Sequence, residues 1–381
     1  MRVSFAAIDP FVEVNVVKAV ERETRSGGMV YWGEVNRYPE YLWSLYRDVP
    51  TLQSVIDGIA DYAAGDGAEL SALPGAVNRR GDTAYEQVKD VAKDICIYGG
   101  FALQVIRDAS GAPAELYWLD MRYLRTDKER TRFWYSEKWG GYGRANTVVY
   151  PAFRPGLDWG SLSPEERAAQ ASTVLYCAGT RRTTYPVPRW GSAVKACEME
   201  RQIDDFHLNS LVNGFHGSQI VNFNNGLPQD DAVKEQVERD FNEKFAGAAN
   251  AGRVMFSWND SYAARTTLEA PKVEDFGERY SLLAARARQE IFTAFRANPN
   301  LFGIPTDGKG FSEEEYAESF RLFNRTVVKP MQTAIEEAYG KIWGADGALK
   351  ITPLSLGDGS ESGASVKSEN NVKSEGGQGN G

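Results

Sequence analysis

The chain has 381 residues, of which 42% are apolar and 25% charged, and its formal net charge is −9. This acidic balance excludes a protein that grips nucleic acid over a broad basic surface, but not one past which DNA moves without adhering. No apolar run approaches the roughly 18 residues of a spanning helix, and the N-terminal residues lack a signal-peptide pattern, so we expect neither membrane contact nor export.

The first half of the chain predicts helices followed by short strands. Residues 1–45 are rich in aromatic and turn residues, which usually pack against a larger unit. Helices are expected from Pro50 to about Gly65, where Leu52, Val55, Ile56 and Ile59 recur at helical spacing, and over residues 82–100. An antiparallel sheet of short strands is expected from the segments at 100–120, 121–127, 130–139, 146–153 and 172–179.

The cysteines and histidines give little sign of a metal site. Cys96, Cys177 and Cys197 are widely spaced, there is no C-x-x-C motif, and the only histidines are His207 and His216. Buried, reduced thiols are the better interpretation, and the two histidines suit capping or surface positions. We therefore expect no metal and no cofactor.

From residue 186 the pattern becomes helical. A helix of some 22 residues, about 33 Å long, is expected after the turn at 186–192. Its apolar side would carry Ala196, Met199, Ile203 and Phe206, and its polar side Lys195, Glu198, Arg201 and Asp205.

A compact α+β unit and a second long helix should follow. Within the unit we expect strands at 218–223, 253–258 and 262–268 and a helix at 231–245. The second long helix has an apolar stripe made of Phe276, Tyr280, Leu283, Ala287, Ile291 and Phe295.

Residues 303–311, GIPTDGKGF, come close to the G-x-x-x-x-G-K-[ST] pattern of a phosphate-binding loop. However, Gly310 stands where a Ser or Thr hydroxyl would contact magnesium, and Pro305 lacks a backbone N–H. The segment before the loop is also expected to be a helix instead of a strand. A flexible connection between two helices is favoured, and a nucleotide-binding enzyme centred on Lys309 is the alternative.

The last expected elements are a long helix, a strand and a tail. The helix, about residues 312–343, begins with a capping box of Ser312 and Glu315, and Pro330 should kink it one turn earlier. A strand is expected at 348–356. Residues 357–381 contain two valines and no other large apolar residue, so disorder is expected there.

No set of residues in the sequence predicts catalysis. The serines lie in no nucleophile-elbow pattern, the carboxylates open helices, and Arg181 and Arg182 suit a solvated loop. Arg286 and Arg288 lie on a predicted helix and suit either one wall of a DNA path or an ion pair between subunits.

Several strings, taken in order, resemble the portal proteins of tailed bacteriophages, in the small single-chain version of that family. They lie at residues 95–120, 185–206, 250–260, 286–305 and 324–342, and the resemblance spans roughly residues 45–356. It implies an α+β fold divided into eight regions. These are an N-terminal arm (1–45), a helix-plus-antiparallel-sheet wing (46–190), a stem helix (191–216), a small α+β clip insertion (217–270), a second stem helix (271–297), a tunnel loop and kinked helix (298–345), a returning strand (346–356) and a disordered tail (357–381).

The resemblance also implies a function. Portal proteins of this kind are non-enzymatic rings, usually of twelve copies, at one capsid vertex, and double-stranded DNA is packaged and ejected through their channel. The implied partners are the terminase large subunit, a head-completion or adaptor protein, and the major capsid or scaffolding protein. The implied location is the virion, with the host cytoplasm during assembly. Another virion ring or adaptor protein is a further alternative.

The resemblance places a small set of residues at the DNA channel. They are Asp307, Gly308, Lys309 and Gly310 of the tunnel loop and Arg286 of the second stem helix. The glycines would act as hinges, and Lys309 would touch passing phosphates transiently while the acidic subunits repel them. The sequence after the kinked helix leaves room for at most a short helical crown.

Overall fold

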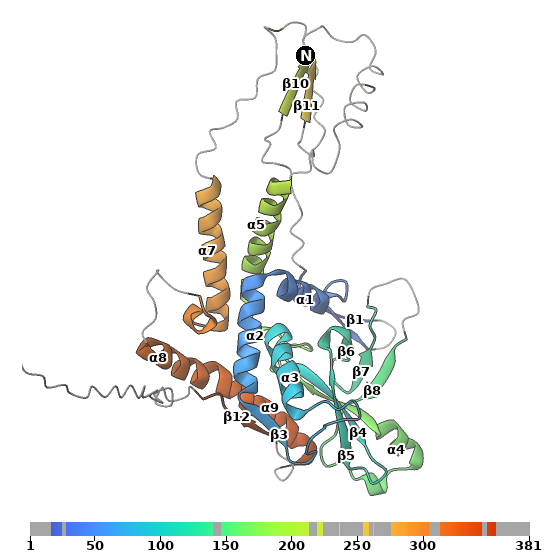
Figure 1. Cartoon of the computed structure of the whole chain (residues 1–381). Helices are drawn as coiled ribbons and strands as arrows, with labels where there is room; N and C mark the ends of the chain where they lie inside the picture. The colour runs from blue at the N-terminus through green and yellow to red at the C-terminus, as the bar shows by residue number, and fades with distance from the viewer. Residues whose placement is uncertain are drawn as a thin grey trace, which may run out of the picture.

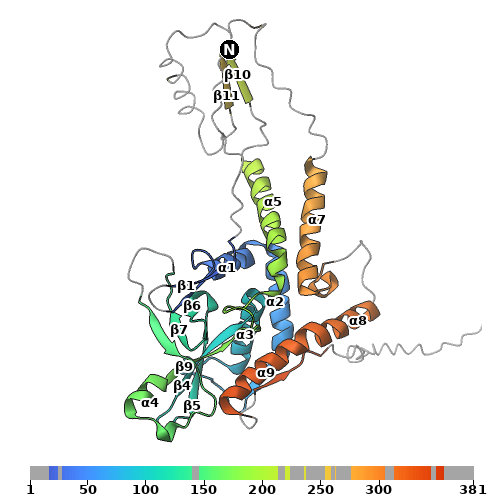
Figure 2. The ribbon, with the colours of Figure 1, turned by 180° about the vertical axis from the view of Figure 1, so that it is seen from behind.

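The computed structural model describes residues 17–24, 28–139, 146–212, 219–223, 236, 254–258, 262, 276–304, 313–344 and 349–355. Helices and antiparallel sheets form a body, and two long helices project from it side by side (Figures 1 and 2). These helices are α5 (Val194–Val212) and α7 (Phe276–Phe295), and the strand pair β10–β11 lies beyond their far ends. The expected α+β class is confirmed. Within the described segments, none of the helices has the length and apolar character to cross a bilayer.

The N-terminal part of the chain belongs to the body. Strand β1 (Glu21–Glu23) pairs with β2 (Val30–Trp32), and α1 (Tyr38–Asp48) follows. Trp32, Leu42 and Leu45 are buried in the same core as the helices after them. The expected boundary between arm and wing, after residue 45, therefore falls inside α1. Side chains on both sides of that boundary are packed together.

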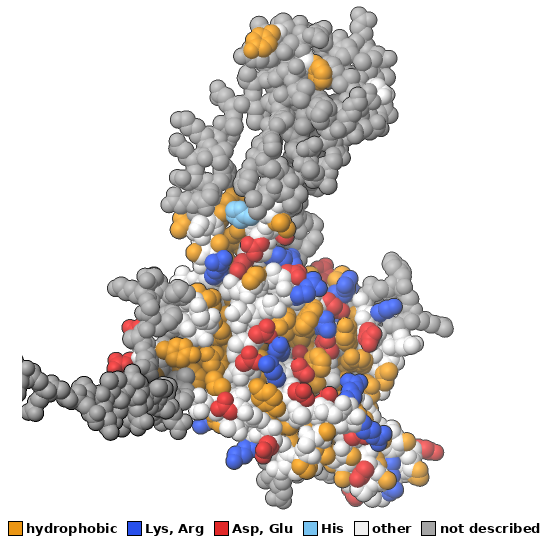
Figure 3. All heavy atoms as spheres, in the orientation of Figure 1, with side chains coloured by type: hydrophobic (Ala, Val, Ile, Leu, Met, Phe, Trp, Pro, Cys, Tyr) orange, Lys and Arg blue, Asp and Glu red, His pale blue; other side chains and the backbone are white. Residues whose placement is uncertain are grey.

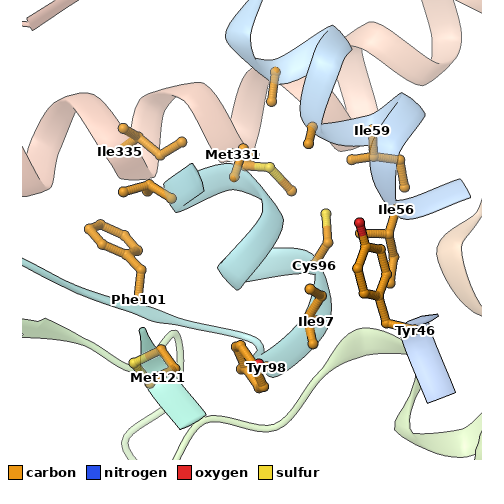
Figure 4. Packing of buried hydrophobic residues seen from close by; sticks show 14 of the residues in the cluster. Tyr46, Ile56, Ile59, Cys96, Ile97, Tyr98, Phe101, Met121, Met331 and Ile335 are labelled. Carbon is orange, nitrogen blue, oxygen red and sulfur yellow. The ribbon is translucent and has the colours of Figure 1, made fainter. Parts of the chain in front are cut away.

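Helices α2 (Pro50–Ala64), α3 (Ala84–Tyr98) and α9 (Lys329–Trp343) form the centre of the core (Figure 4). The apolar positions expected to line α2 are all buried, so that helix is confirmed. Helix α3 begins at a capping box of Thr83 and Glu86 and ends at Gly99, whose φ of +87° suits glycine. Met331 and Ile335 of α9 lie against these helices, so the C-terminal part of the chain closes a core that its N-terminal part begins.

The short strands form two sheets, where one was expected. In the first, β4 (Phe101–Arg107) pairs antiparallel with both β5 (Pro113–Leu119) and β9 (Ser172–Cys177). In the second, β7 (Arg132–Tyr135) pairs antiparallel with both β6 (Leu124–Thr126) and β8 (Val148–Pro151).

The division has a local cause. A single 3₁₀ turn, η1 (Met121–Tyr123), redirects the chain between β5 and β6, and the Asp120 carboxylate caps it by accepting the N–H of Arg122. The two sheets are joined by one parallel bridge between Ala152 and Val174. Two elements that the sequence did not predict, η2 (Trp159–Ser161) and α4 (Pro164–Gln170), lie between β8 and β9.

A third pairing joins distant parts of the chain. Strand β12 (Leu349–Thr352) confirms the expected last strand, and it pairs antiparallel with β3 (Gly67–Leu70). The sequence did not predict β3, which follows α2 after one sharp turn. Gly65 makes that turn with φ +66° and ψ −152°, a conformation available only to glycine.

The small unit beyond the two projecting helices is described only in part. The strands β10 (Gln219–Phe223) and β11 (Val254–Trp258) are confirmed, and they pair in parallel. A parallel pair needs a crossover connection, which agrees with the helix expected between them. The expected helix 231–245, apart from Gln236, and the expected strand 262–268, apart from Tyr262, lie outside the described residues.

The long C-terminal helix is interrupted where Pro330 predicted an irregularity. Helix α8 (Glu313–Phe323) leads into a π-helical turn, η6 (Asn324–Val328), and then into α9. Pro330 has no N–H to donate to Thr326, and the wider turn accommodates this, with Lys329 donating to the carbonyl of Asn324. Ser312, the predicted capping residue, and the predicted tail at 357–381 lie outside the described residues.

The buried carboxyl of Asp94 should make the stability of the protein depend on pH. Asp94 is 3% exposed and accepts a hydrogen bond from the indole Nε1–H of Trp118 at 2.8 Å. Burial, assisted by the negative charge of Asp120, raises its pKa well above the ordinary value. Above pH 4 the native state therefore keeps a proton that the unfolded state releases, and stability falls as the pH rises, by up to about 1.4 kcal/mol per pH unit until the native pKa is reached.

We expect Asp94→Asn to remove this dependence, because the amide oxygen still accepts from Trp118 and carries no charge. The free energy of unfolding of the variant should be flatter between pH 4 and pH 8 and higher than that of the wild type at pH 8. Urea unfolding at each pH measures both. A variant that parallels the wild type across this range would show that Asp94 is not the group responsible.

Candidate functional site

The predicted tunnel loop follows a well-defined helical segment. After α7 comes a 3₁₀ turn, η5 (Pro299–Phe302), which ends at Gly303 with φ +74°. The element before this loop is thus helical, whereas a phosphate-binding loop would follow a strand. Residues 305–312 are outside the described part, and four of the predicted channel residues, Asp307, Gly308, Lys309 and Gly310, lie there.

Phe302 fixes the position from which this loop departs. Its ring lies 5.8–6.2 Å, centroid to centroid, from three other aromatic rings, those of Tyr62, Phe292 and Phe323. Phe320 joins the cluster through Tyr62, at 5.7 Å. A β-carbon added to Gly58 of α2 would lie 2.6 Å from the Phe302 ring, so the aromatic ring packs directly on that glycine. The Tyr62 hydroxyl donates to the Leu301 carbonyl at 3.0 Å. These contacts anchor η5 to the body of the protein.

Arg286, the fifth predicted channel residue, lies on the exposed side of α7. Its side chain is 72% exposed, and its Nε lies 2.9 Å from Glu290 Oε1, one helical turn further on. Arg288 points elsewhere, toward Glu200 of α5 at 3.7 Å. The structure therefore does not bring Arg286 and Arg288 together on one basic surface.

The root of α5 holds two buried carboxylates, which corrects the expectation that Glu198 faces solvent. Glu198 is 2% exposed; it accepts from the Tyr41 hydroxyl at 2.7 Å and from Arg201 at 2.7 Å. Glu200 is 3% exposed and accepts from the Thr51 hydroxyl at 2.6 Å. The donors come from α1 and α2, roughly 150 positions away in the sequence. These bonds tie α5 to the body, since a buried carboxylate is tolerated only with such partners.

Above this root, a groove runs along the side of the α5–α7 pair. Its cavity volume is about 570 Å³. It is lined by Lys195, Glu198, Met199, Gln202, Ile203 and Phe206 of α5 and by Tyr280 and Leu283 of α7. We call this the α5 groove. Phe206 and Tyr280 stack with their ring centroids 4.9 Å apart, which holds the two helices together at this level.

The remaining candidate residues show no common site. His207 lies edge-on to the ring of Tyr280, and His216 is outside the described residues. Cys96 and Cys197 are buried, as expected, whereas Cys177 is half-buried; all three are unpaired. In the segments that the structure describes, no three metal-binding side chains gather.

Comparison with known proteins identifies the family. A sequence model of the family described as phage portal protein matches residues 69–352, well over half of the chain. The chain is thus a structural protein of the phage-particle class. It belongs to the phage portal protein family, as the resemblance in its sequence predicted, and this family is structural in character and not enzymatic. No curated protein matches the chain significantly.

Solved structures of similar proteins include particles and an isolated portal. The virion of a native gene transfer agent particle contains a chain 19% identical, with 83% of this chain and 84% of that chain covered and a TM-score of 0.48. The neck of the native particle, computed with C12 symmetry, gives 19% identity, 82% and 84% coverage and a TM-score of 0.48. An HK97-family phage portal protein from Corynebacterium diphtheriae is 11% identical, with 82% and 94% coverage and a TM-score of 0.46.

Proposed function

We propose that this protein forms a ring of about twelve copies at one vertex of a phage capsid, and that double-stranded DNA is packaged and ejected through its channel. The family match carries the proposal. The protein would be a virion component that assembles in the host cytoplasm and acts as a connector, not as an enzyme.

The architecture supports an assignment of regions. The body would be the wing, α5 and α7 the stem helices, and the segment with β10 and β11 the clip. A protruding tip on two helices suits a docking site for the terminase large subunit and later for a head-completion adaptor. The wing would face the major capsid or scaffolding protein.

The loop between η5 and α8 would be the tunnel loop. Its departure point is anchored by Phe302, so a chain segment that contacts DNA could shift while the body stays fixed. Within it, Lys309 would contact passing phosphates, Gly308 and Gly310 would act as hinges, and Asp307 would limit adhesion. Arg286 would lie either on the wall of the channel or in a contact between subunits.

Electron microscopy or native mass spectrometry of the purified protein tests the ring. We expect closed assemblies of about a dozen subunits at micromolar concentration, and a strict monomer would contradict the proposal. Titration with labelled ATP tests the nucleotide-binding alternative. The portal function predicts no magnesium-dependent binding, in the wild type or in Lys309→Ala.

Lys309→Ala should leave ring assembly unchanged and alter DNA packaging. The reason is that one side chain per subunit at the channel contacts DNA but supports no packing between subunits. Packaged DNA per particle, measured by nuclease protection, and ring content, measured by native mass spectrometry, separate the two effects. If the rings themselves were lost, the lysine would be structural and its placement in the tunnel would be wrong.

A further inference from the structure

The two projecting helices expose large apolar side chains well above the body. Phe206 and Leu208 of α5 are 48% and 60% exposed, and Leu282 and Leu283 of α7 are 66% and 40% exposed. Hydrophobic side chains gather around the pale-blue histidine at the described end of this projection (Figure 3). Large apolar side chains that are exposed in one region of a protein mark an interaction site.

Two different surfaces can be distinguished. One is the α5 groove. The other is a row on α7 made of Leu282, Arg286 and Glu290, which we call the α7 ridge. Residues four apart lie in line on a helix, so these side chains form one continuous row. Arg286 and Glu290 are 72% and 45% exposed.

The ridge and the groove of one chain cannot meet. Ala287 and Ile291 are 1% and 0% exposed and define the inner side of α7, and at 100° per residue Leu282 projects from the opposite side of the helix. A head-to-tail contact between copies uses two different surfaces of the chain, and it generates a ring when the rotation closes. The ridge and the groove meet this requirement.

Contacts within the chain set the level of each residue along the projection. Phe206 lies beside Tyr280, and Glu200 lies beside Arg288. With the same rise per residue in both helices, Leu282 is level with the upper part of the groove, near Phe206. Glu290 is level with its lower end, near Lys195.

One pair of opposite charges lies at nearly equal levels on the two surfaces. Rotation about a ring axis does not change the height of a residue along that axis. If α5 and α7 run parallel to the axis, each residue of a neighbour's ridge therefore meets the part of the groove that lies at the same height. Glu290 then faces the exposed Lys195. Leu282 faces the apolar upper part of the groove, at the level of the exposed Asp205.

We propose that the α7 ridge of one copy lies in the α5 groove of the next copy. The proposal rests on the proposed ring and adds the surfaces through which its stems join. It places Arg286 in the contact between subunits in place of the DNA channel.

Disulfide trapping tests this contact. In Asp205→Cys/Leu282→Cys, the two thiols lie too far apart to join within a chain, so oxidation should give a ladder of covalent multimers on a non-reducing gel. Each single variant should give no ladder. The matched control is Asp205→Cys/Ser281→Cys, because Ser281 is exposed at the same level but lies 100° around α7 from Leu282. The native Cys96 and Cys197 are buried and should not interfere.

A charge exchange gives an independent measurement. Glu290→Lys and Lys195→Glu should each lower the apparent affinity between subunits by about tenfold, because like charges then face each other. The double variant should recover most of the loss. Native mass spectrometry across a concentration series measures the ring fraction.

The outcomes separate the two proposals. A wild type that forms rings, combined with no ladder and no rescue, would overturn the ridge-in-groove contact and leave the ring intact. The exposed surfaces would then bind another virion protein or DNA. A wild type without rings would contradict the proposed function itself, and the contact with it.

Discussion

Arg125→Met should lower the free energy of unfolding by about 3–5 kcal/mol, the loss expected when one partner of a buried charged network is removed. Arg125 is 0% exposed, and its guanidinium makes four hydrogen bonds. Two of these go to the side-chain oxygen and the carbonyl of Asn36, and the other two to the carbonyls of Arg122 and Leu124.

The substitution removes the Arg125 donors from the carbonyls of Asn36, Arg122 and Leu124, whereas the Asn36 side-chain oxygen still accepts from the N–H of Trp32. It also removes the cation 3.6 Å from Glu40, whose pKa burial already raises. Methionine fills the volume but restores no hydrogen bond. The N-terminal segment, including Asn36, would thereby lose its main polar attachment to strand β6.

Urea unfolding followed by tryptophan fluorescence measures the loss. The matched control is Arg132→Met in the same sheet, since Arg132 is 59% exposed and lies 3.9 Å from Asp127. An exposed pair contributes little, so the control should lose less than about 1 kcal/mol. Equal losses in both variants would show that burial of Arg125 does not matter to stability.

Gly65→Ala should destabilise the body by about 3 kcal/mol or more. The conformation of Gly65 is strained for any residue with a β-carbon, and that carbon would lie 2.0 Å from the carbonyl oxygen of Thr352. Because that oxygen belongs to backbone, relief requires α2 and β12 to separate.

Gly67→Ala is the control for this substitution. Gly67 lies two residues away, and an added β-carbon there meets no atom within 4 Å. Its stability should stay within about 1 kcal/mol of the wild type. Denaturant midpoints of the two variants decide the matter, and a Gly65→Ala protein as stable as Gly67→Ala would disprove the close approach of α2 and β12.

The sequence predicted those helices and strands whose formation depends on neighbouring residues in the chain. Helices α2 and α3 and the β4–β5 hairpin are specified by apolar periodicity and by the turn between the strands. The π-helical turn before Pro330 has an equally local cause, the missing N–H of proline.

Long-range partners explain what the sequence did not reveal. Glu198 was expected to face solvent because nothing nearby shows that Tyr41 would donate to it from another helix. Strand β3 was not predicted because it has only four residues and its pairing partner, β12, lies far away in the sequence. The split into two sheets depends on one 3₁₀ turn that sets the direction of β6.

The candidate site was predictable in outline. The glycine-rich pattern predicted a loop between two helices, and the structure adds the aromatic anchor at Phe302, which depends on Gly58 in a distant helix. The α5 groove was not predicted, because its lining combines residues of two helices that are separated by the whole intervening unit.

The closure of the core by C-terminal elements has a consequence for synthesis. Gln332 donates to the carbonyl of Ala63, 269 positions earlier, and Tyr339 donates to Gln87. These contacts, like the β3–β12 pairing, cannot form until the late segments leave the ribosome. Helices α5 and α7 emerge before then, on a body that is still open. The body is therefore complete only after translation has passed residue 352.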